Sequence, residues 1–210
     1  MSTRKRLCER LILQIYGGKP TDDAEITPNQ VNEWLNDAVA AAAKSNYREN
    51  IQLESTAYVN GAFHMTYSDL PVVRDYGDDF LYKVQLPHIP VAIGIDQGVG
   101  SVRFRKGYTS FDAIPLNNKQ SAFASDMRTI PNKILYSTEG KFLFLTTTIQ
   151  LNEFTARVRM ISGGDSKNMD SEVNVPDDYM PEMILYINKM LATQRSSPVD
   201  LQNDGRDLKK

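Results

Sequence analysis

The sequence contains very little cysteine and histidine: its 210 residues include one cysteine and two histidines. A lone Cys8 can neither form a disulfide within the chain nor supply a thiolate zinc site, and two histidines cannot complete a histidine-rich one. Long apolar runs are also missing, because the strongly apolar runs, such as 142–145 and 183–187, are far shorter than the roughly 20 residues of a membrane span. We therefore expect no disulfide, no structural zinc and no membrane span.

The N-terminus also lacks the pattern of a signal peptide, because the basic residues 4–6 precede an apolar stretch that Glu9, Arg10 and Gln14 interrupt. The length fits one domain, or one domain that carries a large insertion. A chain of this size buries enough surface to fold without disulfides or metals. The charged residues nearly cancel, to a formal net charge of −2, as in an ordinary globular protein.

What the sequence does contain begins with a well-marked helix. Thr27 is a good N-cap, Pro28 suits the first helical position, and Gln30 completes a capping box. Apolar residues then recur at helical spacing, with the alanine run 40–43 offering a smooth surface for close packing. We expect this helix to end near Asn46.

Two further helices are predicted near the ends of the chain. The first covers about 7–15 and stops at Gly17-Gly18. The other begins with Asp178 as its N-cap, which places Pro181 in the first turn, where its missing N–H costs little.

Between the second and third helices the apolar period changes from helical to two, which indicates half-buried strands. The turn 138–141 predicts a β-hairpin, and no helix-length pattern separates the strands. The predicted strands cover about 63–67, 80–86, 91–95, 102–104, 134–136, 142–145 and 154–160. We expect an α+β fold, in which a small helical bundle from the N- and C-terminal helices carries a large antiparallel β insertion, shaped as a sandwich or a barrel.

These elements divide the chain into four expected parts. They are a helical N-terminal part (1–48), the antiparallel β insertion (49–174), a C-terminal helix that packs on the N-terminal helices (175–195) and an extended C-terminal tail (196–210). The tail is too polar to fold alone.

Motifs for catalysis and cofactor binding are incomplete. The glycines near 94–100 do not follow the dinucleotide-binding order, and Gly140-Lys141 lacks the rest of a phosphate loop. Cys8 is expected to be a packed apolar residue, and His64 and His88 to have surface or turn positions, because none has an evident partner for nucleophilic catalysis. The acidic pairs fit loops or helix caps better than a shared proton or metal, and are Asp22-Asp23, Asp78-Asp79 and Asp177-Asp178. We expect no catalytic residues and no cofactor.

The charges lie in blocks of alternating sign. Residues 1–20 hold five basic side chains and one acidic one, whereas residues 21–37 hold five acidic side chains and no basic one. Residues 101–141 hold seven basic against three acidic side chains, and residues 165–182 hold six acidic side chains and one lysine. Such blocks suit complementary contacts between subunits, or separately solvated faces.

The basic region contains the run Arg103-Phe104-Arg105-Lys106. In a strand, Arg103 and Arg105 share one face and Phe104 takes the other. Single-strand nucleic-acid binders present basic and aromatic groups together, so a buried Phe104 weakens that interpretation. We expect Arg103, Arg105 and Lys106 to be candidate contacts to DNA in a channel or to another subunit.

The segment Gly18-Lys19-Pro20-Thr21-Asp22-Asp23-Ala24-Glu25-Ile26-Thr27, which leads into the alanine-rich helix, resembles an opening found in tailed-phage virion proteins. It is most similar to the head–tail connector, or ring, proteins of crAss-like phages. Near the C-terminus, Pro176-Asp177-Asp178-Tyr179 and the polar tail with Pro198-Val199-Asp200 and Asn203-Asp204-Gly205 are similar as well. The resemblance covers about 50 residues at the front and about 35 at the back.

The resemblance implies a structural role in the virion, at the head–tail junction. Members of this family form homo-oligomeric rings, commonly dodecamers, below the portal protein and next to adjacent tail proteins, around the channel through which DNA is ejected. They have no catalytic residues to carry over to this chain. The C-terminal tail is expected to lie on an adjacent subunit or ring.

Two other classes stay open. A host-receptor or glycan-binding module, or a tail or baseplate component, would explain the β-rich middle and the tyrosines Tyr58, Tyr76 and Tyr108. A small metal-dependent hydrolase would need a carboxylate cluster that only the fold assembles, with Asp78 or Asp79 in it.

Overall fold

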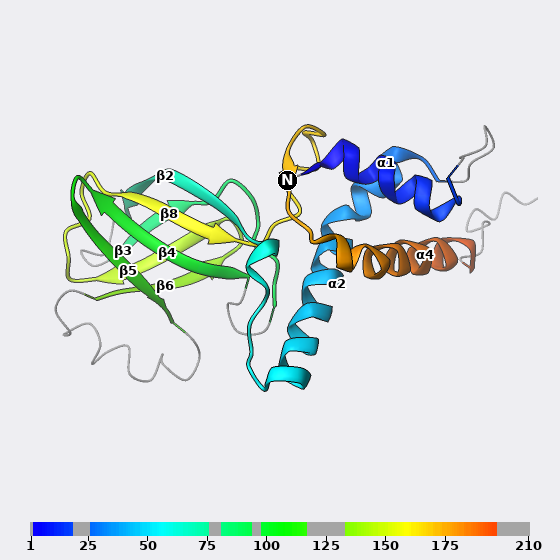
Figure 1. Ribbon diagram of the computed structural model, residues 1–210. Coiled ribbons are helices and arrows are strands. Elements are labelled where there is room, and N and C mark those ends of the chain that lie inside the picture. Colours follow the sequence, from blue (N-terminus) through cyan, green and yellow to red (C-terminus); the bar gives the residue numbers. More distant parts are fainter. Residues whose placement is uncertain (1, 19–25, 76–80, 94–97, 117–132, 197–210) are drawn as a thin grey trace, which may run out of the picture.

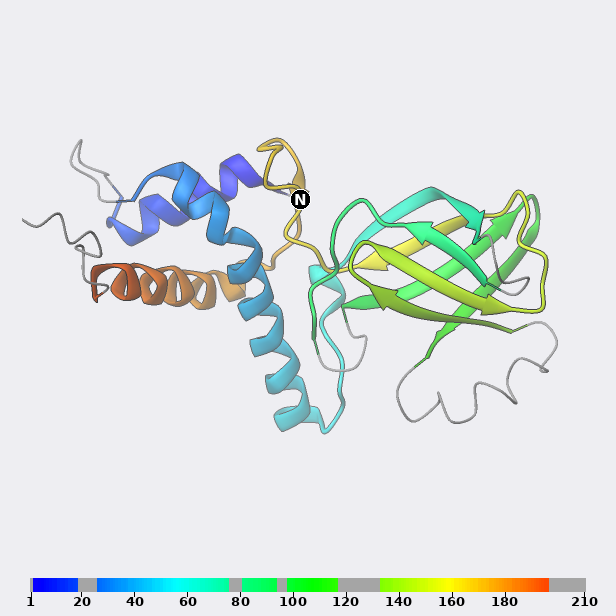
Figure 2. The ribbon, with the colours of Figure 1, turned by 180° about the vertical axis from the view of Figure 1, so that it is seen from behind.

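The computed structural model describes residues 2–18, 26–75, 81–93, 98–116 and 133–196. Three helices form one lobe and a closed barrel of seven strands forms the other (Figures 1 and 2). The expected α+β class with a barrel-like β insertion is confirmed, and a sandwich is not formed. No helix in these residues is both long and apolar enough to cross a membrane.

The helical lobe begins with α1 (Arg4–Ile15) and α2 (Pro28–Glu54). The predicted capping box is present, because the backbone N–H of Gln30 donates to the Thr27 hydroxyl and the backbone N–H of Thr27 donates to the Gln30 side chain. The predicted end of this helix near Asn46 is wrong: α2 continues to Glu54 and is closed by Ser55 at φ 55°. The apolar spacing stops early because the last turn of α2, residues 51–54, is exposed to solvent.

The last helix, α4 (Met180–Ser196), follows the short 3₁₀ helix η3 (Asp177–Tyr179). Asp178 lies inside η3, so the prediction that it caps the helix is wrong, although Pro181 does occupy the first turn of α4. The three long helices share one apolar core, which contains Leu7, Cys8, Leu11, Val31, Trp34, Leu35, Ala38, Ala42, Met183 and Ile187.

The barrel is formed by seven strands in the order β2-β3-β7-β6-β5-β4-β8. The strands are β2 (Met65–Arg74), β3 (Leu81–Gln85), β4 (Val99–Lys106), β5 (Thr109–Pro115), β6 (Ile134–Glu139), β7 (Phe142–Thr147) and β8 (Thr155–Met160). The predicted hairpin is confirmed as β6 and β7. Their inward side chains form a second apolar core, which includes Tyr82, Val84, Val102, Phe104, Leu143, Leu145 and Val158.

Three sequence expectations about the β region are corrected. β5 and β6 pair in parallel, so the barrel is mixed rather than wholly antiparallel; the connection between them, 117–132, lies outside the described residues and is long enough for a parallel crossover. The strand β5 was not predicted. No strand is formed at 91–93, while 94–95 lie outside the described residues.

The two lobes are joined where the N-terminus meets the chain after β8. The two-residue strand β1 (Ser2–Thr3) pairs with β9 (Glu172–Val173), so the N-terminus lies between the lobes (Figure 1). Ile93 and Ile161, from the barrel end, are buried in the helical core. The first strand and the start of the first helix therefore pair with segments that follow the barrel in sequence.

Arg4 connects three segments at this junction. Its side chain is fully buried. Nε donates to Asn32 Oδ1 at 2.8 Å and Nη2 to the Asn32 carbonyl at 2.6 Å, both on α2. Nη1 donates to Asn36 Oδ1 at 2.6 Å and to the carbonyl of Gly163, just after β8. Gly163 packs so closely on α2 that a Cβ there would collide with Asn36.

Replacing Arg4 with methionine is expected to lower the free energy of unfolding by about 3 kcal/mol or more, because the buried oxygens of Asn32, Asn36 and Gly163 lose their donor. Urea denaturation followed by circular dichroism measures this change. Arg6→Met is the matched control: Arg6 is exposed on the same helix, so its effect should stay within about 0.5 kcal/mol. Equal effects of the two substitutions would contradict the role given to Arg4.

Candidate functional site

The residues predicted as candidate contacts, Arg103, Arg105 and Lys106, lie at the end of β4 that is farthest from the helices (Figure 1). Arg103 and Arg105 face solvent, and Phe104 between them is fully buried in the barrel. This alternation is the one that the sequence predicts. Lys106 reaches across to Glu153, with Nζ 2.6 Å from Oε2.

The fold adds a fourth cation to this surface. Arg157 on β8 is directly opposite Arg103 in the strand register, and its side chain is exposed. We call Arg103, Arg105, Lys106 and Arg157 the basic face. No sequence pattern indicates that Arg157 joins the other three, because the pairing of β4 with β8 connects residues 50 or more positions apart.

A β-bulge in β2 hollows the surface beside Arg157. Tyr67 pairs with Val158 and Leu70 with Ala156, so Ser68 and Asp69 together oppose the single residue Arg157. Asp69 has φ 59°, a conformation that few residues other than glycine adopt. The resulting hollow has a volume of about 410 Å³ and is lined by Ser68, Asp69, Arg103, Arg105, Gly107, Tyr108, Ser110, Thr155 and Arg157.

Only part of the positive charge is neutralised by close carboxylates. Arg103 donates to both carboxylate oxygens of Asp112 on β5, at 2.6 and 3.3 Å, and this hydrogen bonding lowers the pKa of Asp112. Arg105 donates to the carbonyl of Gly107 at 2.9 Å. Because both side chains of the Arg103–Asp112 pair are exposed, water weakens the pair and an anionic ligand can compete for Arg103.

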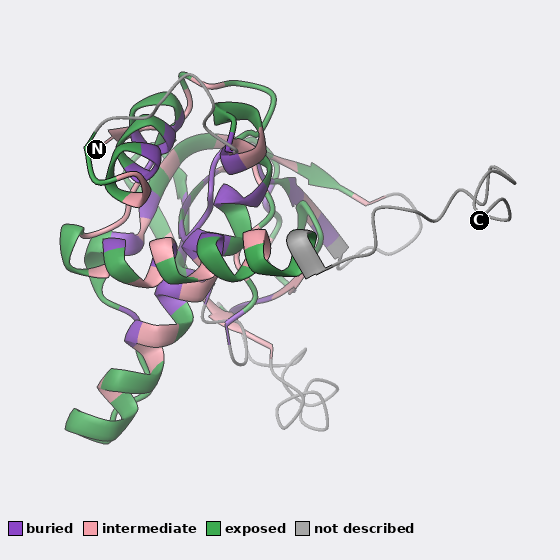
Figure 3. Cartoon of the chain, turned by 90° about the vertical axis from the view of Figure 1, so that its right-hand side faces the viewer, coloured by how far each residue is buried: buried purple, intermediate pink, exposed green. Residues whose placement is uncertain are grey.

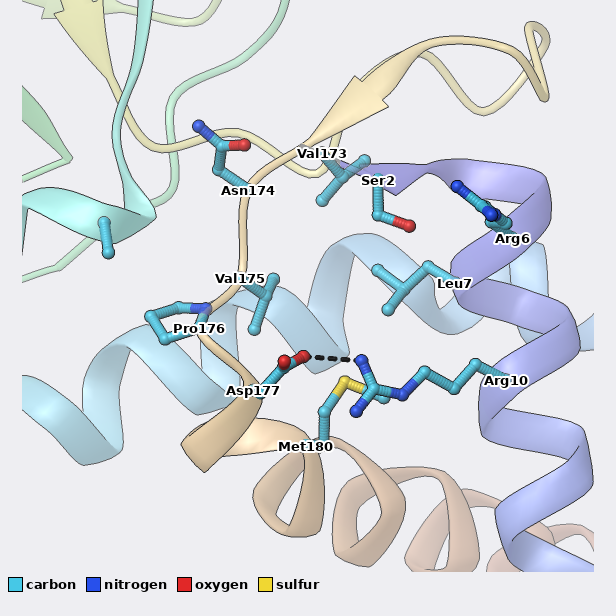
Figure 4. A pocket seen from close by; sticks show the side chains of 11 residues that line it. Ser2, Arg6, Leu7, Arg10, Val173, Asn174, Val175, Pro176, Asp177 and Met180 are labelled. Atoms are coloured by element: carbon cyan, nitrogen blue, oxygen red, sulfur yellow. Dashed lines mark hydrogen bonds and ion pairs between the residues drawn. The ribbon is translucent and has the colours of Figure 1, made fainter.

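A second concave surface lies in the helical lobe, between α1 and the segment that leads into α4 (Figure 4). It has a volume of about 730 Å³, with Leu7, Val173 and Met180 as apolar lining. Across it Arg10 Nη1 lies 2.5 Å from Asp177 Oδ1, in an exposed ion pair. We call this surface the α1 groove.

The α1 groove shows where two of the charge blocks meet. The basic block 1–20 contributes Arg6 and Arg10 to the groove, and the acidic block 165–182 contributes Asp177. The pairing of β1 with β9 brings these blocks side by side within one chain. Part of the alternating charge is therefore matched within one chain.

The fold does not gather the residues considered for nucleophilic catalysis. Cys8 is fully buried in the helical core, as predicted, and burial raises the pKa of its thiol to about 11. His64 lies at the barrel end near Gly100, and burial and then Arg159 lower the pKa of its imidazole. His88 stands edge-on to Tyr67, with ring centres 5.7 Å apart.

One of the three acidic pairs lies in the described part of the chain. Asp177-Asp178 forms η3, whereas Asp22-Asp23 and Asp78-Asp79 lie outside the described residues. Within the described part of the chain, no three histidine, cysteine, aspartate or glutamate residues are grouped so that they could hold a metal ion.

Two of the tyrosines considered for glycan binding, Tyr58 and Tyr108, are not brought together. Tyr58 follows α2 in the helical lobe and donates to Glu54 at 2.8 Å. Tyr108 is in the turn between β4 and β5, and Tyr76 lies outside the described residues.

One surface feature was missed at the level of sequence: the projecting end of α2. We call residues 51–58, which form the last turn of α2 and the start of the return chain, the α2 tip. It is the green helical end in Figure 3, and it exposes Leu53 by 83%, Ile51 by 41% and Tyr58 by 38%. The sequence signal for this feature is the presence of two apolar residues, Ile51 and Leu53, beyond the point where the apolar spacing of the helix stops.

The chain matches none of the protein-family models and none of the curated proteins with which it was compared. The surfaces described above therefore carry the functional argument together with the sequence resemblance.

Cys8 in the folded protein is expected to resist thiol reagents at pH 8. With a pKa of about 11, about one thiol in a thousand is ionised, and burial hinders access further. We expect labelling to be at least about 100-fold slower than in urea, measured with a chromogenic disulfide reagent. Rapid stoichiometric labelling of the native protein would contradict the buried position.

Proposed function

We propose that the protein is a structural virion protein of a tailed phage, which forms a ring below the portal in the head–tail connector. In this proposal twelve copies assemble side by side and support the channel for DNA ejection. The ring contacts the portal on one side and adjacent tail proteins on the other.

The sequence resemblance supports the proposal through segments that the structure places in one lobe. Thr27 caps α2, and Pro176-Asp177-Asp178-Tyr179 leads into α4, which packs against α2. Both segments shape the helical lobe, and the barrel is inserted between them. The remaining segments of the resemblance, 19–25 and 197–210, lie outside the described residues.

The α2 tip is the observation that carries the proposal. Leu53, Ile51 and Tyr58 are exposed to water at this helix end, and a group of exposed apolar side chains on a projecting element is a candidate interaction surface. The tip projects from the bundle, so it can reach a neighbour that the bundle itself does not touch (Figure 2).

A second copy of the chain is the occupant that we propose for this tip. When a surface of one subunit binds a different surface of the next, the contact closes into a ring if the rotation between subunits fits. A projecting tip on an elongated, two-lobed subunit suits such a contact. The basic face, on the other lobe, is then free for contacts with DNA or with adjacent proteins.

Light scattering of the purified chain, alone and mixed with the portal protein of the same phage, tests the proposal. We expect the mass of a large closed ring, formed by the chain alone or on addition of the portal. A monomer or a trimer under both conditions would contradict it, and a trimer would favour a receptor-binding module.

Leu53→Glu is expected to abolish ring assembly, because it places a charge in the apolar contact of the α2 tip. The free energy of unfolding should change by less than about 0.5 kcal/mol, because Leu53 makes little contact within the subunit. Gln52→Glu is the matched control, since it adds the same charge at the neighbouring exposed position and leaves Leu53 in place. Light scattering reports assembly, and urea denaturation reports stability.

If Leu53→Glu assembles as well as the unmodified chain, or if Gln52→Glu is equally disruptive, the α2 tip is not the contact that closes the ring.

A further inference from the structure

We propose that the basic face binds the phosphodiester backbone of single-stranded nucleic acid, and that Tyr108 stacks on an unpaired base beside it. This inference goes beyond the proposed function, because it concerns the chain itself and holds whether or not the chain forms a ring.

The first argument is that the fold presents basic and aromatic groups together. The sequence weakens this interpretation, since Phe104, the aromatic residue between the arginines, is buried. In the structure Tyr108 takes that place: it lies in the turn after β4, it is fully exposed, and it lines the same hollow as Arg103 and Arg105. A basic groove next to an exposed aromatic ring is the usual design of a single-strand binding surface.

The second argument is that folding alone does not explain the basic face. Arg103 and Arg157 are directly opposite each other on adjacent strands, and like charges in that position destabilise a sheet. Asp112 compensates Arg103 from the β5 side. Arg157 is opposed on its other side by the bulge, whose Asp69 lines the hollow with it. A bound anion would relieve the repulsion between the two guanidinium groups.

The third argument is the shape of the surface. The bulge at Ser68 and Asp69 opens a hollow of about 410 Å³ over the arginines, so that an extended chain of anionic groups can approach the strands. Ser68, Ser110 and Thr155 add hydroxyl groups to its lining. Arginine and hydroxyl side chains are the usual donors to phosphate oxygens.

The chemistry favours nucleic acid over an acidic protein segment. A guanidinium group has the right geometry for both phosphate and carboxylate, because two parallel N–H groups can donate to two oxygens of either. The exposed ring of Tyr108 favours nucleic acid over an acidic peptide, because an aromatic ring adds binding energy when a base can stack on it. With few cations and nearby acids such as Asp112, binding should be moderate and strongly dependent on salt.

The test is fluorescence anisotropy of a labelled oligothymidine, titrated with the full chain at about 50 mM salt and again at about 200 mM. A duplex of the same length and a labelled polyglutamate peptide are the comparison probes. Light scattering of the same samples reports assembly separately, so that a failure of this inference and a failure of the ring proposal can be told apart.

The double variant Arg105→Gln/Arg157→Gln should raise the dissociation constant for the single strand at least about tenfold and reduce the salt slope by about 1.4, at about 0.7 for each lost phosphate contact. Tyr108→Ala should weaken single-strand binding by about tenfold and leave duplex binding nearly unchanged. The matched control is the double variant Lys44→Gln/Lys189→Gln, which removes one exposed cation from α2 and one from α4 and should leave binding unaffected.

Three results would overturn the inference. They are no binding of the single strand by the unmodified chain at low salt, equal losses in the basic-face and control variants, and tighter binding of polyglutamate than of the oligonucleotide. The last result would assign the basic face to an acidic protein partner.

Discussion

The buried guanidinium of Arg4 holds the two lobes in one arrangement. Removing an arginine side chain from water is costly, and burial lowers the pKa of Arg4. The cost is offset because its donors point to oxygens on α2 and after β8 at the same time. A lysine could not replace it, because a single ammonium group lacks the planar fork that reaches several partners at once.

Because this junction fixes α2 relative to the barrel, the surfaces proposed for function keep fixed positions as well. The α2 tip projects from one lobe, and the basic face lies at the far end of the other (Figure 1). The α1 groove lies in the helical lobe, where Arg10 and Asp177 already pair the basic block 1–20 with the acidic block 165–182. In the proposed ring, the chain would present an apolar contact at the α2 tip and a charged contact at the basic face to different partners.

The sequence predicted those features that depend on neighbouring residues. The capping box of Thr27 and Gln30 and the hairpin at 138–141 are local, so their residue types were sufficient. The end of α2 was predicted too early, because apolar periodicity reports where a helix is packed and not where it stops.

Features that depend on residues far apart in the chain could not be predicted from the sequence. Three such features join segments that are far apart in the chain. They are the burial of Arg4, the position of Arg157 opposite Arg103, and the parallel pairing of β5 with β6. In the candidate site, the sequence alone predicts Arg103, Arg105 and Lys106 as contact residues, because they are neighbours in one strand. Arg157, the bulge at Ser68 and Asp69, and the pairing of Tyr108 with the arginines became visible only in the fold.

Electron microscopy of the chain mixed with the portal protein of the tailed phage to which we propose it belongs tests the ring proposal. We expect a closed ring with a central channel, coaxial with the portal and attached to one face of it, with the α2 tip of each copy in contact with the next. Images that show the portal bare, beside unassembled monomers or trimers of this chain, would contradict it.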